Sequence, residues 1–552
     1  MVTRIAALLV VVVVLAAPFV LSAGTPRAAS SDEDVPTVVV VTPHAEQLRT
    51  EFAEGFARWH QRVHGSPARA EMRQPGGTRE IQNQLQAEYR AAIKAGLISP
   101  EGEAQQGAVS ADLMFGGGTY EHNRLARPDA VRATLPGRDE PVELSVSVPA
   151  GFRPENLEEW FGEVAMAGTE PVYHPEQYWI GSALSSFGIV FNRPAMARLK
   201  PSEPDPNPKG FHDLASPIMI GEIALADPRL SGSIVTTMDS ILGYYKARSM
   251  RGEGSGDWDE GWRVLRGMGA NTRYFTGSST KPPRDVAAGE AAAGLAIDFY
   301  GRAQAQAVLQ PGETPGEGRV GYVDPVGAVY VDPDPISMLR GGPNPELARR
   351  FIAFVLSEEG QALWQFPAVT SERGASNPTL DGEPMGPRRY ELRRMPIRPS
   401  MYEEYFDVFV DRVNLYELAS DTKNPGWRAG VEMMLGAACI DAHETQRAAW
   451  VAIADARAAA NPVAEVERLT DVFYSWPTPE RIEAIWNERF GAGDVALPDD
   501  ALLAWTEENY RRIRDTWRDG RVERRLRIVY TLAFEEIYER VIEEATGLGG
   551  GA

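Results

Sequence analysis

The stretch that decides the fold is residues 221–245, which read GEIALADPRLSGSIVTTMDSILGYY. It opens with a short apolar run at residues 223–226, whose length suits a buried strand. After a turn of small residues, apolar side chains recur with helical period over residues 234–245, which predicts a helix with one buried face. The first N–H groups of that helix, and the positive end of its dipole, suit an anion or a polar solute. The structural alternative, which such a stretch in isolation favours, is that Ser231 or Ser233 only caps the helix.

A second strand-to-helix passage opens the polar part of the chain. Residues 35–41 are β-branched and predict a buried strand. We expect Thr42 to cap the following helix and Pro43 to be its first residue, which places His44 just after the strand, where the chain turns into the helix. His60 and His64 lie four residues apart, as metal ligands on a helix can, but no carboxylate motif accompanies them and we interpret them as a solvated face.

Glycine- and serine-rich turns follow three more predicted strands. They occupy residues 76–78, 116–120 and 277–281. Glycine lets the backbone approach a ligand closely, and polar turns at the carboxyl ends of strands form ligand sites in open α/β sheets. Each turn alone could be merely permissive, so their number is what favours a shared site.

Composition and length limit the classes of function that this chain can have. The 552 residues predict two or three domains, and the net charge of −21 argues against a nucleic-acid partner or a broad anionic-membrane surface. The only cysteine, Cys439, lies in an apolar context and is expected to be a buried thiol. The sequence carries no GxSxG, HExxH or P-loop motif, so we expect neither an enzyme nor a cofactor.

The N-terminus predicts export. Arg4 precedes a nearly continuous apolar run at residues 5–21 and small residues at 22–24, the pattern of a secretory signal peptide over residues 1–24. The run is long for a signal peptide, so an uncleaved N-terminal anchor is the alternative. Both place the protein in the periplasm or cell envelope.

Six fragments in this order resemble the extracellular solute-binding proteins of ABC importers. The likeness is to the branch that includes ferric-iron, sugar-phosphate and phosphonate binders, and it covers about residues 35–366. The fragments are VVVVTPH (38–44), DLMFGGG (112–118), FGIVFN (187–192), ALADPRLSGS (224–233), VAAGEAAAGLAIDFY (286–300) and FIAFVLSEEGQALW (351–364).

The resemblance implies an α/β fold of type II, the two-lobed periplasmic-binding-protein-like fold, followed by a mainly α-helical C-terminal extension. The implied first lobe comprises residues 35–185 and 322–366, and the second lobe comprises residues 186–321. A linker at residues 367–399 would lead to the extension at residues 400–552, which could wrap the lobes or meet a protein partner.

The resemblance also implies a ligand site at the turns of both lobes. The expected partners are a small anionic organic solute with a phosphate, sulfonate or carboxylate group, and an ABC permease in the inner membrane. The expected ligand-binding residues are His44, Gly77, Thr78, Gly117, Gly118, Ser185, Arg229, Ser231, Gly232, Ser233, Ser278, Ser279, Asp298 and Tyr300.

Two alternatives stay open. Ferric-binding relatives use adjacent tyrosines after the segment that here reads GLAI, and one of these is replaced by phenylalanine. An iron site would therefore have to use His44, Asp298 and Tyr300. The other alternative is an envelope sensor or scaffold that keeps the fold without a transport role.

Overall fold

The computed structural model describes residues 35–163, 165–251, 258–313, 316–491 and 493–549. The predicted signal peptide or anchor lies outside these residues. Within them, none of the helices combines the length and the apolar character that a membrane crossing needs.

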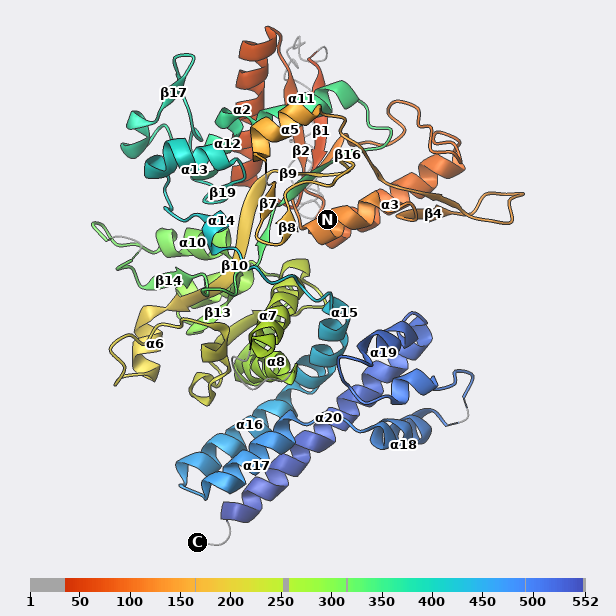
Figure 1. The fold of residues 1–552 in the computed structure, drawn as a ribbon, viewed down its shortest axis with the longest axis vertical. Helices are drawn as coiled ribbons and strands as arrows, with labels where there is room; N and C mark the ends of the chain where they lie inside the picture. Colours follow the sequence, from red (N-terminus) through yellow and green to blue (C-terminus); the bar gives the residue numbers. More distant parts are fainter. Residues whose placement is uncertain (1–34, 164, 252–257, 314–315, 492, 550–552) are drawn as a thin grey trace, which may run out of the picture.

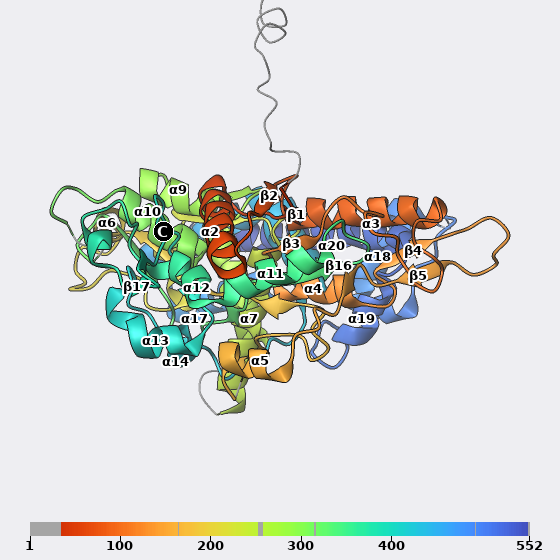
Figure 2. The same ribbon diagram turned by 90° about the horizontal axis from the view of Figure 1, so that it is seen from above.

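The first lobe is a mixed sheet with helices on both faces (Figure 1). In β1, Val38 and Val40 enter one hydrophobic cluster while Val39 and Val41 enter another, because side chains alternate between the two faces of a strand. Figure 2 shows helices α2 and α11 over this sheet, and both contact it. The strands run in the order β2 (Arg69–Arg73), β1 (Thr37–Val41), β3 (Leu113–Phe115), β16 (Pro335–Leu339), β6 (Ser147–Val148), with β9 (Ile180–Gly181) beside β16; the helices are α2 (Glu46–His64), α3 (Thr78–Lys94), α4 (Thr119–Ala126), α5 (Pro154–Phe161), α11 (Pro345–Leu356) and α12 (Glu358–Gln365).

The second lobe repeats this architecture. Its strand β11 (Ile223–Ala226), which lies between two other strands, is fully buried and is followed by α7 (Gly232–Met250), as the opening stretch predicts. The strand order is β12 (Thr272–Thr276), β11, β13 (Ala293–Ile297), β10 (Ala183–Asn192), β14 (Val320–Val323), and the helices are α6 (Arg193–Leu199), α8 (Asp259–Asn271), α9 (Lys281–Ala288) and α10 (Asp298–Ala307).

Extended segments cross between the lobes. The chain leaves the first sheet at β9 and enters the second at β10, then returns from β15 (Val331–Asp332) to β16. A further segment, β19 (Met395–Pro396), pairs with the start of β10. The expected lobe boundary at residue 322 falls inside β14, which belongs to the second sheet, so the return occurs about ten residues later. Sequence alone could not place it, because both sheets accept short buried strands.

The C-terminal region does not form a separate domain. Residues of the expected linker, such as Met395 and Ile397, belong to the hydrophobic cluster of the first lobe. Beyond them, buried residues of α16 and α20 share one continuous cluster with α7 and α8 of the second lobe (Figure 1). The region contains α13 (Pro399–Tyr405), α14 (Leu415–Leu418), α15 (Arg428–Gly430), η5 (Val431–Asp441, a π-helical stretch), α16 (His443–Ala458), α17 (Val463–Tyr474), α18 (Pro479–Phe490), α19 (Tyr510–Thr516) and α20 (Gly520–Gly549).

Two local expectations are wrong. Helix α2 begins at Glu46 with Ala45 before it, so neither Thr42 nor Pro43 starts the helix, and residues 42–45 belong to no helix or strand. His60 is buried against Phe56, and its Nδ1 pairs with the Ser66 carbonyl at 2.8 Å, whereas His64 is exposed as expected. Cys439 is buried, and burial raises its pKa to about 11, as expected of a structural thiol.

Candidate functional site

A cleft of about 970 Å³ opens between the two lobes. The turns that follow β1, β2 and β3 line it from the first lobe, and the turns that follow β11 and β12 line it from the second. All these turns lie at the carboxyl ends of their strands, which is why the strand order brings them to one place. A cleft of this size accepts a small organic molecule.

Most of the predicted site residues lie together in this cleft. Only Arg229 and Asp298 are outside its lining. The predicted residues that line it are His44, Gly77, Thr78, Gly117, Gly118, Ser185, Ser231, Gly232, Ser233, Ser278, Ser279 and Tyr300.

Arg229 is held away from the cleft by two carboxylates. Its guanidinium donates to Asp227 at 2.8 Å and to Asp441 at 2.8 Å, and the second contact fastens η5 to the turn after β11. Asp298 is fully buried at the start of α10, and burial raises its pKa to about 7. Asp298 is therefore not part of the cleft lining, whereas His44 and Tyr300 are.

The glycine turn after β3 does not offer free amides. The Gly117 N–H donates to Asp334 at 3.1 Å, Gly118 donates to Glu121 at 3.2 Å, and Thr119 donates to Asp332 at 3.2 Å. The carboxylates of this chain therefore occupy the donors that we expected a solute to use. The glycines are needed for space, since a Cβ on Gly117 would lie 2.7 Å from Thr78 Cγ2 and its φ is +103°.

The N-terminus of α7 is capped and faces the first lobe. Ser231 Oγ accepts from Ile234 N at 3.4 Å and lies 3.2 Å from Ser233 Oγ. A Cβ added to Gly232 would lie 2.8 Å from Glu121 Oε1, so the carboxylate of Glu121 lies beside this helix end. The capping alternative for Ser231 is correct, and it does not remove Ser231 or Ser233 from the cleft.

The floor of the cleft is a buried polar cluster. His44 Nε2 lies 3.4 Å from Asp334 Oδ2, and Arg394 pairs with the same carboxylate while its guanidinium lies 3.7 Å from the Phe299 ring centre. Burial lowers the pKa of His44 well below its usual value and the nearby Arg394 lowers it further, so the imidazole is neutral at pH 7. Burial raises the pKa of Tyr300, and its phenol stays protonated.

Charged and aromatic side chains that sequence reasoning missed complete the lining. Five arginines face four carboxylates here, although the whole chain carries −21. A signal existed for Arg284, which follows the serine-rich turn on α9, but Arg394 and Arg428 come from segments that looked like a linker and an extension. The missed residues are Arg79, Glu80, Tyr120, Glu121, Arg124, Phe187, Arg284, Phe299, Asp332, Arg394, Arg428 and Glu432.

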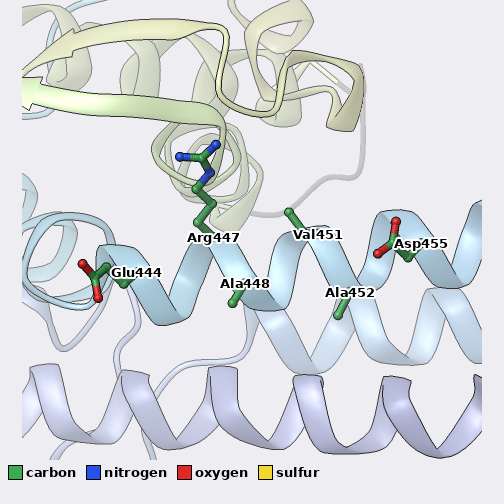
Figure 3. A pocket seen from close by; sticks show the side chains of 6 residues that line it. All are labelled: Glu444, Arg447, Ala448, Val451, Ala452 and Asp455. Atoms are coloured by element: carbon green, nitrogen blue, oxygen red, sulfur yellow. The ribbon is translucent and has the colours of Figure 1, made fainter.

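A second hollow, of about 540 Å³, lies on α16 and differs in kind. Side chains of this one helix line it, and Arg447 projects from it toward the second lobe (Figure 3). A site on one side of a single helix lacks the converging polar groups that fix a small molecule. Among the described residues, no group of three or more His, Cys, Asp or Glu side chains is arranged to hold a metal ion.

Residues 155–385 match the family model described as bacterial extracellular solute-binding protein. This region, which includes the crossing strands and the second lobe, is similar to that family over less than half of the chain. The family consists of binding proteins of transport systems.

Individual relatives are distant. An uncharacterized protein of Haemophilus influenzae is 25% identical over 263 residues, which is 47% of this chain and 62% of the relative, so the match spans less than two thirds of that protein. The periplasmic binding protein AfuA of Actinobacillus pleuropneumoniae, solved with fructose-6-phosphate, is 17% identical with a TM-score of 0.42 over 59% of this chain and 81% of AfuA. Iron-bound HitA of Pseudomonas aeruginosa is 17% identical with a TM-score of 0.40 over 59% and 82%.

Proposed function

We propose that this chain is an exported binding protein that captures a small anionic organic solute in the cleft and delivers it to an ABC permease. The observation that carries the proposal is the cleft itself, which both lobes line with polar turns and arginines. The match of residues 155–385 to a family of solute-binding proteins supports the same class of function.

Charge favours an anionic solute. Among the described residues, the Arg284 guanidinium donates hydrogen bonds only to Thr280, with Nε donating to the carbonyl at 3.2 Å and Nη2 donating to Oγ1 at 3.1 Å. Arg284 and Arg124 form no ion pair with any Asp or Glu in the described part of the chain. A guanidinium without a carboxylate partner is ready for a bidentate contact with a phosphate, sulfonate or carboxylate.

Hydroxyl groups complete the set of donors. Ser278 Oγ lies 2.9 Å from Thr280 Oγ1, and Ser279 lies between them on the second lobe. Tyr300 and Phe299 add aromatic surface beside these hydroxyls, which suits an organic body attached to the anionic group. We therefore place the anionic group near Arg284 and the organic part toward Tyr300.

Calorimetric titration of the purified chain tests the proposal. The panel contains inorganic phosphate, sulfate, citrate, a sugar phosphate, an alkyl phosphonate, an alkyl sulfonate and ferric citrate. We expect one organic anion to bind at a single site and to raise the melting temperature by mass action. Binding of ferric citrate with a tyrosinate-to-iron absorption band would instead favour iron as the solute.

Variants locate the site. Arg284→Gln should weaken binding of the panel compound at least tenfold, because one charge-assisted contact contributes about 1.5–3 kcal/mol. The matched control is Arg457→Gln on α16, which is exposed and far from the cleft lining. Joint replacement of Ser233 and Ser279 by alanine should also weaken binding. Unchanged affinity in both cleft variants would refute this site, and a chain that ignores the whole panel would favour a sensor or scaffold.

A further inference from the structure

The C-terminal region reaches into the cleft through Arg428 and Glu432, and Arg428 makes the closer contacts with the first lobe. This residue lies beyond the family match, which ends at residue 385. Its side chain is mostly buried and lines the cleft beside Tyr120 and Glu121. A segment outside the two lobes thus forms part of the wall of their shared site.

Arg428 is attached to the second lobe at its base. The two backbone N–H groups before it, those of Trp427 and Gly426, donate to the Asp239 carboxylate of α7 at 2.7 and 3.2 Å. Trp427 is buried, and the Lys246 ammonium lies 5.3 Å from its ring centre. Asp239 is buried too, so the backbone just before Arg428 is held against α7 in a buried position.

The tip of the same side chain contacts the first lobe. The guanidinium carbon lies 3.9 Å from the Tyr120 ring centre, and Nη2 lies 3.5 Å from Glu121 Oε1. Nη1 meanwhile donates to Thr236 Oγ1 of α7. One guanidinium therefore spans α4 of the first lobe and α7 of the second, across the cleft.

A weaker contact of the same kind lies nearby. Glu432 of η5 approaches Arg79 of the first lobe, with 3.9 Å between the carboxylate and guanidinium atoms. Both contacts join a first-lobe residue to the segment that Asp239 anchors. If the lobes opened about the segments that cross between them, from β9 to β10 and from β15 to β16, both contacts would break together.

We propose that Arg428 is a positioning residue of the solute site: anchored on the second lobe, it holds the first lobe against it and closes this side of the cleft. A cation stacked on an aromatic ring and paired with a carboxylate adds a small but directional preference for the closed arrangement. Such a preference raises the closed population before a solute arrives and thereby raises apparent affinity. The effect on solute affinity rests on the proposed function, whereas the distance measurement that tests the inference needs no solute.

The test measures the distance between the lobes without any solute. Spin labels are placed at Ala91→Cys on α3 and Ala197→Cys on α6, two exposed positions on rigid helices of opposite lobes, with buried Cys439 replaced by alanine. Pulsed electron resonance then gives the distance distribution. We expect Arg428→Ala to add a population displaced by more than about 2 Å, the scale of a hinge rearrangement.

Three further variants distinguish a contact that holds the two lobes together from a general loss of stability. Tyr120→Ala removes the stacking surface from the first lobe at an exposed position, so it should fold and should shift the distances as Arg428→Ala does. Arg428→Lys keeps the charge but loses the planar stacking and should shift them partly. Arg457→Ala on α16 should leave them as in the wild type.

Distances that stay the same in both Arg428→Ala and Tyr120→Ala would overturn the inference. A failed solute screen does not alter these distances, and unchanged distances do not alter a solute titration. The two proposals therefore fail separately.

Discussion

Arg266 offers the sharpest test of how the C-terminal region is joined to the second lobe. It lies on α8, is 1% exposed, and donates to the carbonyls of Phe473, Tyr474 and Ser475 at the end of α17. Its guanidinium also lies 5.1 Å from the Phe534 ring centre of α20. The side chain therefore crosses the boundary between lobe and extension inside their common core.

Replacement of Arg266 by methionine keeps most of the volume and removes all of these donors. Three carbonyls lose their partner, and a buried unsatisfied group costs about 1–3 kcal/mol. Removal of a buried charge offsets part of this loss. We expect a net loss of about 3 kcal/mol in the free energy of unfolding, a large fraction of the stability of an ordinary domain.

Urea denaturation, followed by circular dichroism and by tryptophan fluorescence, measures the loss. Because the core is continuous, the transition of the second lobe and that of the extension should move together. The matched control is Arg263→Met on the same helix, which is 43% exposed and pairs with Asp259 and Asp471, and it should cost less than about 1 kcal/mol. An Arg266→Met protein within 1 kcal/mol of the wild type, by the same measurement, would refute this reasoning.

Three further predictions concern single sites. Asp298 has a folded pKa of about 7, above its unfolded value of 3.8. Its contribution to stability is therefore fully present below the unfolded pKa and is lost as pH rises from there through 7. The stability of the wild type relative to Asp298→Asn should fall by about 2.6 kcal/mol between pH 5 and pH 8, measured by urea denaturation, and a constant difference would contradict this expectation. Ser357 caps α12, because its Oγ accepts a hydrogen bond from Gly360 N at 3.2 Å. Ser357→Ala should lower the free energy of unfolding by about 1 kcal/mol in the same assay. Gly116→Ala forces a Cβ to within 2.3 Å of the His44 ring at a φ of +89°. It should lower the free energy of unfolding by more than about 1 kcal/mol in the same assay, and a smaller loss would show that the floor of the cleft is not tightly packed.

Local patterns predicted the elements that form the cleft. The run before Asp227 is a strand and the stripe after Ser231 is a helix, because burial of one face needs only the spacing of nearby residues. Within each lobe the polar turns meet because parallel strands end on the same side of their sheet, which is a rule of topology rather than of sequence detail. The sequence together with the family resemblance could therefore predict that the turns at 116–118, 231–233 and 278–280 share one crevice.

The details that depend on distant partners could not be predicted in this way. The residues near Arg229 do not predict that its guanidinium pairs with Asp441. Those near Gly117 do not predict that its N–H donates to Asp334. Arg428 is separated from Tyr120 by most of the chain, yet the two stack. Side-chain pairing across the cleft is set by tertiary packing, which no local period encodes.

The central claim is that one solute is held by both lobes at once. Hydrogen-exchange mass spectrometry of the full chain, with and without the panel compound that raises the melting temperature most, tests it directly. We expect slower exchange on both sides of the cleft, at residues 76–82 of the first lobe and 277–284 of the second. Protection confined to one lobe, protection centred on α16, or no compound that stabilises the chain would contradict it.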